Sequence, residues 1–455
     1  MFIGRKNELN ILEKLYSSNS LQIIHVAGER NIGKTALLKN FARHKKTIYF
    51  CVRQALENAN KSSFCAEVRE QINIVEAKSY DWIEILEQIC HLSCGEKIVF
   101  IVDNAHYLQF YFSSFMDEFF KILLNFGNKL RLTIIMSGRD DWKIPENNQY
   151  AGFPVTEIML NPVSFLEAGK FLTGFNIEDR VLLYGITGGY PCYLQYIDNN
   201  VAVKDNLYNL FYNQQALLLN EPNVILLDKL REPSTYNSIL CSVACGAVRV
   251  NEIAEAVGME CNKLSKYLNV LLRLRIIKRI VPVTEQNEKR QHKKTYYKLS
   301  NTMLDFWYQF VFPYLSLIAM NKGAQILRNK VLPKLGIYCA MIFNDICLQQ
   351  CKVLMQRKNF MFDFQWVGSY WDNKIAMGDK VQLAYNSSAA CFIKCDWNRQ
   401  KTDIDVLQRL EEDIRGLQYT RIYYLLFSRK GFTDRLLNYS ANNSDVRLIS
   451  LQYLK

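Results

Sequence analysis

The stretch Gly28-Glu29-Arg30-Asn31-Ile32-Gly33-Lys34-Thr35 decides the fold class of this chain. It follows an apolar run rich in β-branched residues at 21–27, and residues 35–42 after it have helical spacing. In a strand, glycine-rich loop and helix of this kind, backbone N–H groups hold phosphate oxygens, and the positive end of the helix adds to the anion site. The sequence therefore predicts a P-loop that binds a nucleotide.

Individual side chains of this loop have predicted roles. Lys34 is expected to reach the β- and γ-phosphates, and the Thr35 hydroxyl is expected to bind Mg²⁺. We expect further contacts with the nucleotide from the rest of the loop and the first residues of the helix: Gly28, Arg30, Asn31, Ile32, Gly33 and Ala36.

The first 140 residues alternate between strand-like and helix-like segments. Strand-like runs at 47–52, 98–102 and 132–136 are almost uninterruptedly apolar, and helical spacing is found at 64–73 and 81–93. Strands of this composition are typical of a parallel sheet that helices cover on both faces. The pattern predicts an α/β P-loop NTPase core with such a sheet.

Polar residues follow the two later strands. Asp103 is predicted to hold Mg²⁺ through water, as the acidic residue opposite the P-loop. Many such ATPases have a glutamate at the next position to polarise the attacking water, whereas this chain has Asn104; an amide cannot accept the proton, so we expect slow hydrolysis. His106 is a candidate substitute, although a lone histidine near a strand end is more often structural. Ser137 or Arg139 is placed to sense the γ-phosphate, and Arg139 is equally open to a reading as a solvated loop residue.

The remaining chain changes character twice. It becomes mainly helical from about residue 164, and residues 231–300 then contain three helical stretches before a hairpin, which is the order of a winged helix-turn-helix. Strands return in the last hundred residues. The predicted domains are an NTPase core at 1–163, a helical lid at 164–230, a winged helix-turn-helix at 231–300, and a helical connector with an α+β domain at 301–455.

Basic residues gather in the predicted winged helix. The candidate recognition helix at 262–273 carries Lys263 and Lys266. The predicted hairpin tip adds Lys289, Arg290, Lys293 and Lys294. Such a surface suits contact with the phosphates of duplex DNA. The alternative is that the tip is simply solvated and that the module serves interdomain packing.

The composition and the cysteine content indicate in which cellular compartment the protein resides. The 455 residues carry a formal net charge of +12, 49% are apolar and 22% are charged, which is typical of a folded soluble protein. There are 13 cysteines but no C-x-x-C pair, and only five histidines, so we expect free thiols and no zinc site. We also expect no membrane span, because the longest apolar run, 306–320, contains Gln309 and Pro313. These features indicate a cytoplasmic protein.

Ordered motifs along nearly the whole chain resemble the prokaryotic ATPases of the archaeal-ATPase clade in the STAND class of signal-transduction NTPases. The motifs are Phe2-Ile3-Gly4-Arg5 with Glu8, the P-loop, Asp103, Asn161-Pro162-Val163-Ser164-Phe165, Gly188-Gly189-Tyr190-Pro191, Glu232-Pro233, Ser265-Lys266-Tyr267-Leu268 and Asp305-Phe306-Trp307. The resemblance implies ATP and Mg²⁺ as ligands. It also implies that Arg5 lies near adenine and that Pro191 packs on the base.

The resemblance extends to a C-terminal domain of the PD-(D/E)XK restriction-endonuclease type. Active members place an Asp and then Glu-x-Lys on the following strand around a metal ion. In our alignment these positions hold Gln382, Lys394 and Asp396, so the metal site is degenerate and we expect no nuclease activity. A shifted alignment through Asp379 and Asp396 is the alternative.

Three functions follow from this sequence. The first is an ATP-dependent molecular switch with slow hydrolysis, whose partners include ATP and a regulatory protein or a second copy of the chain, but no membrane. The second is a DNA-binding regulator that uses the basic winged helix and is modulated by nucleotide. The third is a metal-dependent nuclease, which the degenerate metal site disfavours.

Overall fold

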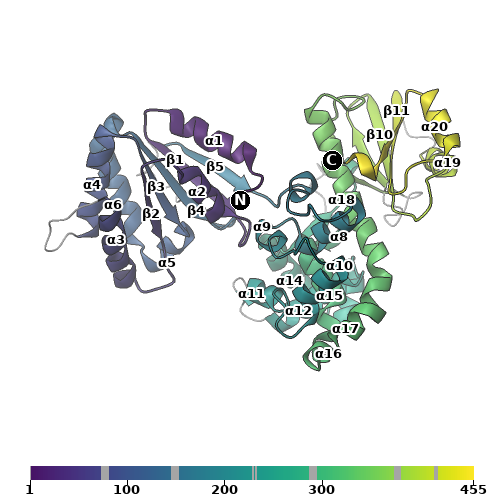
Figure 1. Cartoon of the computed structure of the whole chain (residues 1–455), viewed down its shortest axis with the longest axis horizontal. Helices are drawn as coiled ribbons and strands as arrows, with labels where there is room; N and C mark the ends of the chain where they lie inside the picture. Colours follow the sequence, from purple (N-terminus) through teal and green to yellow (C-terminus); the bar gives the residue numbers. More distant parts are fainter. Residues whose placement is uncertain are drawn as a thin grey trace. The chain divides into compact units, whose positions relative to one another are not determined.

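The computed structural model describes residues 2–72, 81–144, 153–227, 230, 233–285, 295–372, 381–414 and 419–454. The chain forms two compact units (Figure 1). The first comprises Met1–Val163 together with Tyr190–Cys192, and the second comprises Ser164–Gly189 together with Tyr193–Lys455. The finer division into four domains stays a prediction.

The first unit is built on a parallel five-stranded sheet with the strand order β2-β3-β4-β1-β5. The strands are β1 (Gln22–Gly28), β2 (Thr47–Cys51), β3 (Ile98–Asp103), β4 (Leu132–Gly138) and β5 (Val155–Leu160). Every residue of β3 and β4 is buried, which explains why these two read as uninterrupted apolar runs. The predicted parallel sheet is confirmed.

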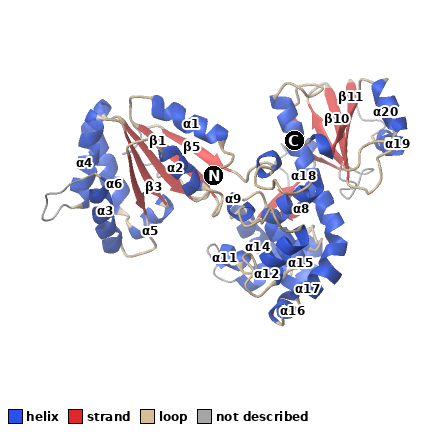
Figure 2. Ribbon diagram, in the orientation of Figure 1, coloured by secondary structure: helices blue, strands red, loops and turns tan. Residues whose placement is uncertain are grey.

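Helices cover both faces of this sheet (Figures 1 and 2). They are α1 (Lys6–Ser17), α2 (Lys34–Ala42), α3 (Glu57–Gln71), α4 (Trp82–Gly95), α5 (Leu108–Tyr111) and α6 (Ser114–Phe126). An aromatic core joins α3 and α6 to the strands, because the Phe64 ring packs edge-on against Phe50, Phe100 and Phe115. The sheet is thereby packed against α3. This helix also makes polar contacts with β2.

Two parts of this unit were not expected from the sequence. Helix α3 begins at Glu57, well before the predicted start at residue 64, and β5 was not predicted. Strand β5 lies at the edge of the sheet and only Ile158 and Leu160 are buried. Its apolar signal is therefore weaker than that of the central strands.

The second unit begins with helices α7 (Phe165–Ala168), α8 (Ile177–Thr187), α10 (Val203–Leu207) and α11 (Glu221–Leu227). Helices α12 (Pro233–Ala244), α13 (Val250–Val257) and α14 (Cys261–Arg273) then precede β6 (Ile277–Ile280) and β7 (Tyr296–Leu299), which pair antiparallel. This helix-and-hairpin order agrees with the prediction for 231–300, but a winged helix-turn-helix stays a prediction. Four predicted DNA contacts lie outside the described residues: Lys289, Arg290, Lys293 and Lys294.

The remainder of the second unit joins helices to a second sheet. The helices are α15 (Thr302–Phe310), α16 (Leu315–Ala319), α17 (Gly323–Ile326), α18 (Leu335–Gln356), α19 (Ile404–Asp413) and α20 (Asp434–Ala441). The strands are β8 (Trp366–Tyr370), β9 (Val381–Tyr385), β10 (Ala389–Asp396), β11 (Arg421–Ser428) and β12 (Val446–Ser450). Their order is β12-β11-β10-β9-β8, and β9 runs antiparallel to both β8 and β10, whereas β10, β11 and β12 are parallel.

One helical stretch changes the expectation about membrane spans. Residues Gly323–Gln356 are long and apolar enough to cross a membrane by length and composition, with a mean hydropathy of 1.5. Isolated polar residues interrupt this stretch, so it is not seen as an unbroken apolar run in the sequence. Length and composition alone do not make a span, and Tyr338, Ile342 and Phe343 of α18 are buried in the second unit.

The pairing of β9 with β10 corrects the predicted nuclease alignment. Gln382 pairs with Ile393, whereas Lys394 pairs with Val381. Paired residues lie on the same face of a sheet and successive residues on opposite faces. Gln382 therefore lies on the face opposite Lys394 and Asp396, and its side chain donates a hydrogen bond to the backbone oxygen of Asn344 in α18, over 2.8 Å.

The position across from Lys394 is thus occupied by the apolar Val381 and holds no carboxylate. Asp396 is held within its own segment, where it accepts hydrogen bonds from the Thr402 hydroxyl at 2.6 Å and from the Asn398 backbone at 3.0 Å. Asp379, on which the alternative alignment depends, lies outside the described residues. A restriction-endonuclease-like fold stays a prediction for this domain.

Candidate nucleotide-binding site

The backbone of the loop 28–35 has the conformation that its glycines permit. Gly33, which precedes the first residue of α2, has a φ of 96°, and Asn31 has a φ of 64°. A Cβ atom at Gly28 would lie 3.0 Å from Ile32 Cγ2 and 3.1 Å from the backbone oxygen of Leu160. Close packing against β5 and the left-handed turn therefore explain both glycines of the motif.

Lys34 lies against the loop that precedes it. Its ammonium donates hydrogen bonds to the backbone oxygens of Gly28 at 2.7 Å and Glu29 at 2.8 Å. Burial lowers the pKa of Lys34 to about 8, although the carboxylates of Asp103, Asp140 and Glu29 act in the opposite direction. The lysine is thus a partly desolvated cation at the N-terminal end of a helix, where an anionic ligand gains most.

Asp103 is the centre of the polar contacts at this site. Its side chain is buried, and its Oδ2 atom accepts hydrogen bonds from Thr35 Oγ1 and from the Tyr49 hydroxyl, each at 2.7 Å. Its Oδ1 atom accepts from the Ser137 hydroxyl and from the backbone N–H of Asn104, the latter at 3.0 Å. These donors come from α2, β2, β4 and the end of β3, so the carboxylate connects the P-loop helix to three strands.

The residues brought together here suit a hard cation. Thr35 donates its proton to Asp103 and keeps oxygen lone pairs that can face a metal ion. Because four donors already occupy the lone pairs of Asp103, a metal-bound water would have to replace one of them to hydrogen-bond to this carboxylate. Among the described residues there is no group of three or more His, Cys, Asp or Glu side chains that could hold a metal ion. A magnesium ion at this place would accordingly take its other ligands from water and from a bound phosphate, which is the usual mode for Mg²⁺.

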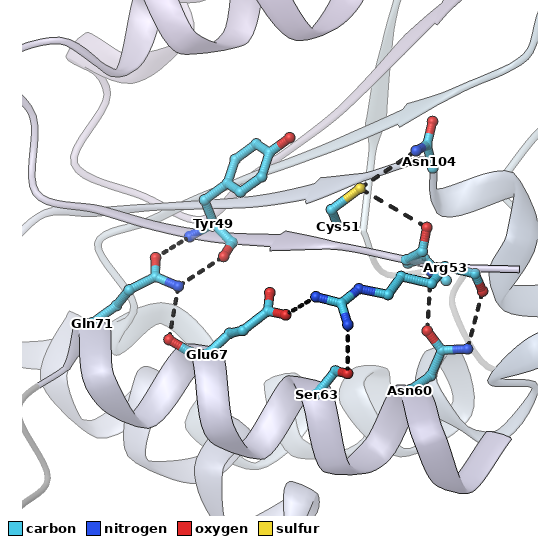
Figure 3. Close-up of polar contacts among 9 residues, drawn as sticks. Tyr49, Cys51, Arg53, Asn60, Ser63, Glu67, Gln71 and Asn104 are labelled. Atoms are coloured by element: carbon cyan, nitrogen blue, oxygen red, sulfur yellow. Dashed lines mark hydrogen bonds and ion pairs between the residues drawn. The ribbon is translucent and has the colours of Figure 1, made fainter. Parts of the chain in front are cut away.

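Asn104 has a strained backbone and a fixed side chain. Its φ is 56°, in the left-handed region, and its Nδ2 atom donates to the Cys51 thiol over 3.4 Å (Figure 3). The predicted sensor Arg139 lies near an acid, with its Nε 3.5 Å from Asp141 Oδ1. The alternative water-polarising residue, His106, is buried beside the ring of Tyr107.

Arg5 supports the loop from the N-terminal segment. Its side chain is buried, donates to the backbone oxygen of Ile32 over 2.9 Å and pairs with Glu8 at 3.2 Å. Its place beside adenine stays a prediction. The predicted contacts Arg30 and Ala36 are exposed at the loop and helix, whereas Ile32 is buried.

The segment Tyr190–Cys192 belongs to the same compact unit as the P-loop. Pro191, the first residue of α9 (Pro191–Leu194), lies beside the loop, because a Cβ atom built on Gly33 would be 3.7 Å from Pro191 Cγ. The Tyr190 hydroxyl donates to the carboxylate of Glu29 in the loop. The structure therefore brings the predicted base-packing proline next to the phosphate loop.

Sequence reasoning missed three of these participants: Tyr49, Cys51 and the Glu29–Tyr190 pair. Tyr49 and Cys51 lie on β2, where they alternate with buried Ile48 and Phe50 and look like ordinary strand residues. Parallel register pairs Cys51 with Asp103, so knowledge of the strand order would have placed them beside the acidic residue.

The fold and the site define a P-loop nucleoside triphosphatase. The family model described as "AAA domain" matches residues 18–142, and a second model, described as "Archaea bacterial proteins of unknown function", matches residues 307–407. An uncharacterized ATP-binding protein of Methanocaldococcus jannaschii is 44% identical over 46 residues, which are 10% of this chain and 78% of that protein. Residues 18–142 of this chain therefore form an AAA-type P-loop ATPase domain.

Two further comparisons cover more of the chain. An uncharacterized protein of Methanocaldococcus jannaschii is 25% identical over 450 residues, which are 94% of this chain and 96% of that protein. A solved structure, that of the Walker-type ATPase of Pyrococcus abyssi, is 16% identical in sequence and has a TM-score of 0.47. The match covers 68% of this chain and 96% of the Pyrococcus chain.

A buried histidine lies in β1, directly upstream of the loop. His25 contacts the Trp142 ring edge-on with 5.0 Å between ring centroids. Burial lowers the pKa of His25 to about 4, with Glu157 raising it and Lys143 and Lys34 lowering it further. The imidazole is therefore neutral in the folded protein at physiological pH.

This histidine predicts a loss of stability in mild acid. Its pKa is about 4 in the folded chain and 6.5 ordinarily, so the unfolded chain binds the additional proton as the pH falls below 6.5. The free energy of unfolding is expected to fall by about 2 kcal/mol between pH 7.5 and pH 5 through this group. Urea unfolding followed by Trp fluorescence measures it. His25→Leu should remove this part of the pH dependence, whereas His44→Gln at an exposed position should retain it.

Proposed function

We propose that this chain binds Mg²⁺-ATP and acts as a nucleotide-dependent molecular switch of the STAND class. The observation that carries the proposal is the hydrogen bond between Thr35 and Asp103, 2.7 Å long, which joins the P-loop helix to the acidic end of β3. A metal-bound triphosphate needs this pair of oxygens together with a lysine at the loop. Lys34 supplies that cation.

Hydrolysis is expected to be slow in this proposal. Asn104 follows Asp103 where a carboxylate would accept a proton from the attacking water, and an amide cannot do so. Its Nδ2 atom is also engaged by the Cys51 thiol. Slow turnover suits a switch, because the ATP-bound state then lasts long enough to be recognised by a partner.

The Tyr190–Cys192 segment is the candidate link between nucleotide and the rest of the chain. These residues belong to the unit of the P-loop, while the residues on either side of them belong to the second unit. A change at Glu29 or Gly33 on nucleotide binding therefore reaches Tyr190 and Pro191 directly. A ligand shifts such an equilibrium by the difference between its affinities for the two states.

Lys34→Ala should abolish most nucleotide binding. The variant removes a partly desolvated cation whose hydrogen bonds to phosphate are worth about 2–3 kcal/mol, so the Kd for Mg²⁺-ATP should rise about 100-fold. Titration with a fluorescent ATP analogue measures this affinity. Lys39→Ala, at an exposed position on the same helix α2, is the matched control and should bind as the wild type does. Unchanged binding in Lys34→Ala would refute the proposed site.

Asn104→Glu should accelerate ATP hydrolysis. The variant places a proton acceptor beside Asp103, and a positioned general base contributes factors of about 100 or more, so we expect kcat to increase on the order of 10- to 100-fold. Phosphate release under saturating ATP measures kcat. Asn104→Gln is the matched control, because it imposes the same left-handed backbone on a longer side chain without a carboxylate. Equal rates in the two variants would mean that this position does not limit turnover.

A second candidate function, binding to duplex DNA, rests on the surface of α14. Its exposed positions include Asn262, Lys263, Lys266 and Asn269, and the helix contains no acidic residue. Arg279 of β6 donates to the Asn269 side chain over 3.3 Å, which places another cation beside this face. A basic helix with amide side chains suits contact with phosphates and base edges.

Replacing both Lys263 and Lys266 by alanine should weaken DNA binding in a salt-dependent way. If both lysines contact phosphates, the slope of log affinity against log salt concentration should decrease by about 1.8. Fluorescence anisotropy with a labelled duplex at several salt concentrations measures the slope. Lys322→Ala with Lys330→Ala removes the same charge from another exposed part of the second unit and should leave the slope unchanged. Absence of binding by the wild type at low salt would eliminate this function.

A further inference from the structure

Strand β2 is the edge strand beside the acidic residue. Its Cys51 is in register with Asp103, and Tyr49 lies two residues earlier, on the same face. The Tyr49 hydroxyl donates to Asp103 Oδ2 over 2.7 Å, the oxygen that also accepts from Thr35. Tyr49 therefore touches the carboxylate that the proposed function assigns to Mg²⁺.

The backbone at Tyr49 is fixed by a side chain from another element. An edge strand leaves backbone groups on its outer side without a neighbouring strand. Here the Gln71 side chain of α3 fills both places, since it accepts from the Tyr49 N–H at 2.7 Å and donates to the Tyr49 oxygen at 2.8 Å (Figure 3). Gln71 is itself held by the backbone oxygen of Glu67 at 2.9 Å. The position of the phenol is thereby set by α3.

The chain just beyond β2 is fixed as well. Asn60 of α3 accepts from the Arg53 N–H at 3.0 Å and donates to the Arg53 oxygen at 3.1 Å, and the Arg53 guanidinium contacts Ser63 and Glu67 (Figure 3). Helix α3 thus holds the backbone on both sides of Cys51. Such bracketing restrains the strand where it contacts Asp103.

The Tyr49 phenol is a hydrogen-bond donor to Asp103 Oδ2. Burial and the nearby negative charge of Asp103 both raise the pKa of Tyr49. This donor and the Thr35 hydroxyl occupy the lone pairs of Oδ2, while Ser137 and the Asn104 N–H occupy those of Oδ1, so the rotation of the carboxylate is fixed.

We propose that Tyr49 is a positioning residue that orients the Asp103 carboxylate for the Mg²⁺ ion of the bound nucleotide. The inference rests on the proposed function, because it presumes that Mg²⁺-ATP binds beside Asp103. Groups that orient a metal-binding side chain typically contribute a factor of 10–100 to metal affinity or activity. Tyr49 does not contact the nucleotide in this arrangement and acts through Asp103.

Tyr49→Phe tests this role with two readouts. ATP affinity is measured once in EDTA and once across a Mg²⁺ titration, using the full-length chain and a fluorescent ATP analogue. We expect the ATP affinity of the variant in EDTA to equal that of the wild type. The Mg²⁺ concentration that produces half of the Mg²⁺-dependent increase in ATP affinity should be roughly 10-fold higher in the variant. If the hydroxyl had only a structural role, Tyr49→Phe would lower the ATP affinity equally in EDTA and in Mg²⁺, or would change it in neither condition.

Two other variants make the result decisive. Tyr16→Phe removes a hydroxyl from a tyrosine whose ring packs on Phe41, away from Asp103, and should leave the Mg²⁺ titration unchanged. Gln71→Ala keeps the phenol but frees the backbone at Tyr49, and should shift the titration in the same direction as Tyr49→Phe. If circular dichroism shows that Tyr49→Phe does not fold, the Mg²⁺ titration of Gln71→Ala tests the positioning role in its place.

The outcomes separate the two levels of the proposal. A wild-type chain that binds no ATP at any Mg²⁺ concentration overturns the proposed function and the inference with it. A wild type that binds ATP in a Mg²⁺-dependent way, with the same Mg²⁺ requirement in folded Tyr49→Phe, overturns the positioning role alone.

Discussion

The buried carboxylate of Asp103 is the constraint on which the nucleotide-binding unit depends. A polar side chain with 2% of its surface exposed is tolerated only when hydrogen bonds replace the lost water. Thr35, Tyr49, Ser137 and the Asn104 backbone provide those bonds. Each donor comes from a different part of the sheet or from α2, so satisfying this one side chain requires the strand order that the fold adopts.

This requirement explains which parts of the site were predictable from sequence. The loop 28–35 and Asp103 carry their signal locally, in a glycine pattern and in an acidic residue at the end of a fully buried strand. Tyr49 has no such signal. Its role depends on β2 lying beside β3 in parallel register, which is a long-range property that a single sequence does not state.

The same distinction applies to the rest of the fold. Strands β3 and β4 were predictable because burial on both faces removes polar residues from them, whereas the edge strand β5 was missed because most of its side chains remain partly exposed. In the second sheet, the motif alignment assigned Gln382 to one site together with Lys394 and Asp396 of β10, whereas the strand register pairs Gln382 with Ile393 and so places it on the other face. A shift of one residue reverses the face of every side chain, so a weak motif cannot determine such a site.

The arrangement around Asp103 also bears on the proposed switch. Asn104 is held by Cys51 and follows directly on the carboxylate that Tyr49 holds, so the two residues closest to the expected water and metal are both restrained by β2. Helix α3 holds β2 and the chain just beyond it through Gln71 and Asn60. A restrained site reorganises little during catalysis, but without a proton acceptor at Asn104 its preorganisation favours binding over turnover. This arrangement is consistent with the proposed switch, in which a partner recognises the bound nucleotide and does not depend on rapid hydrolysis.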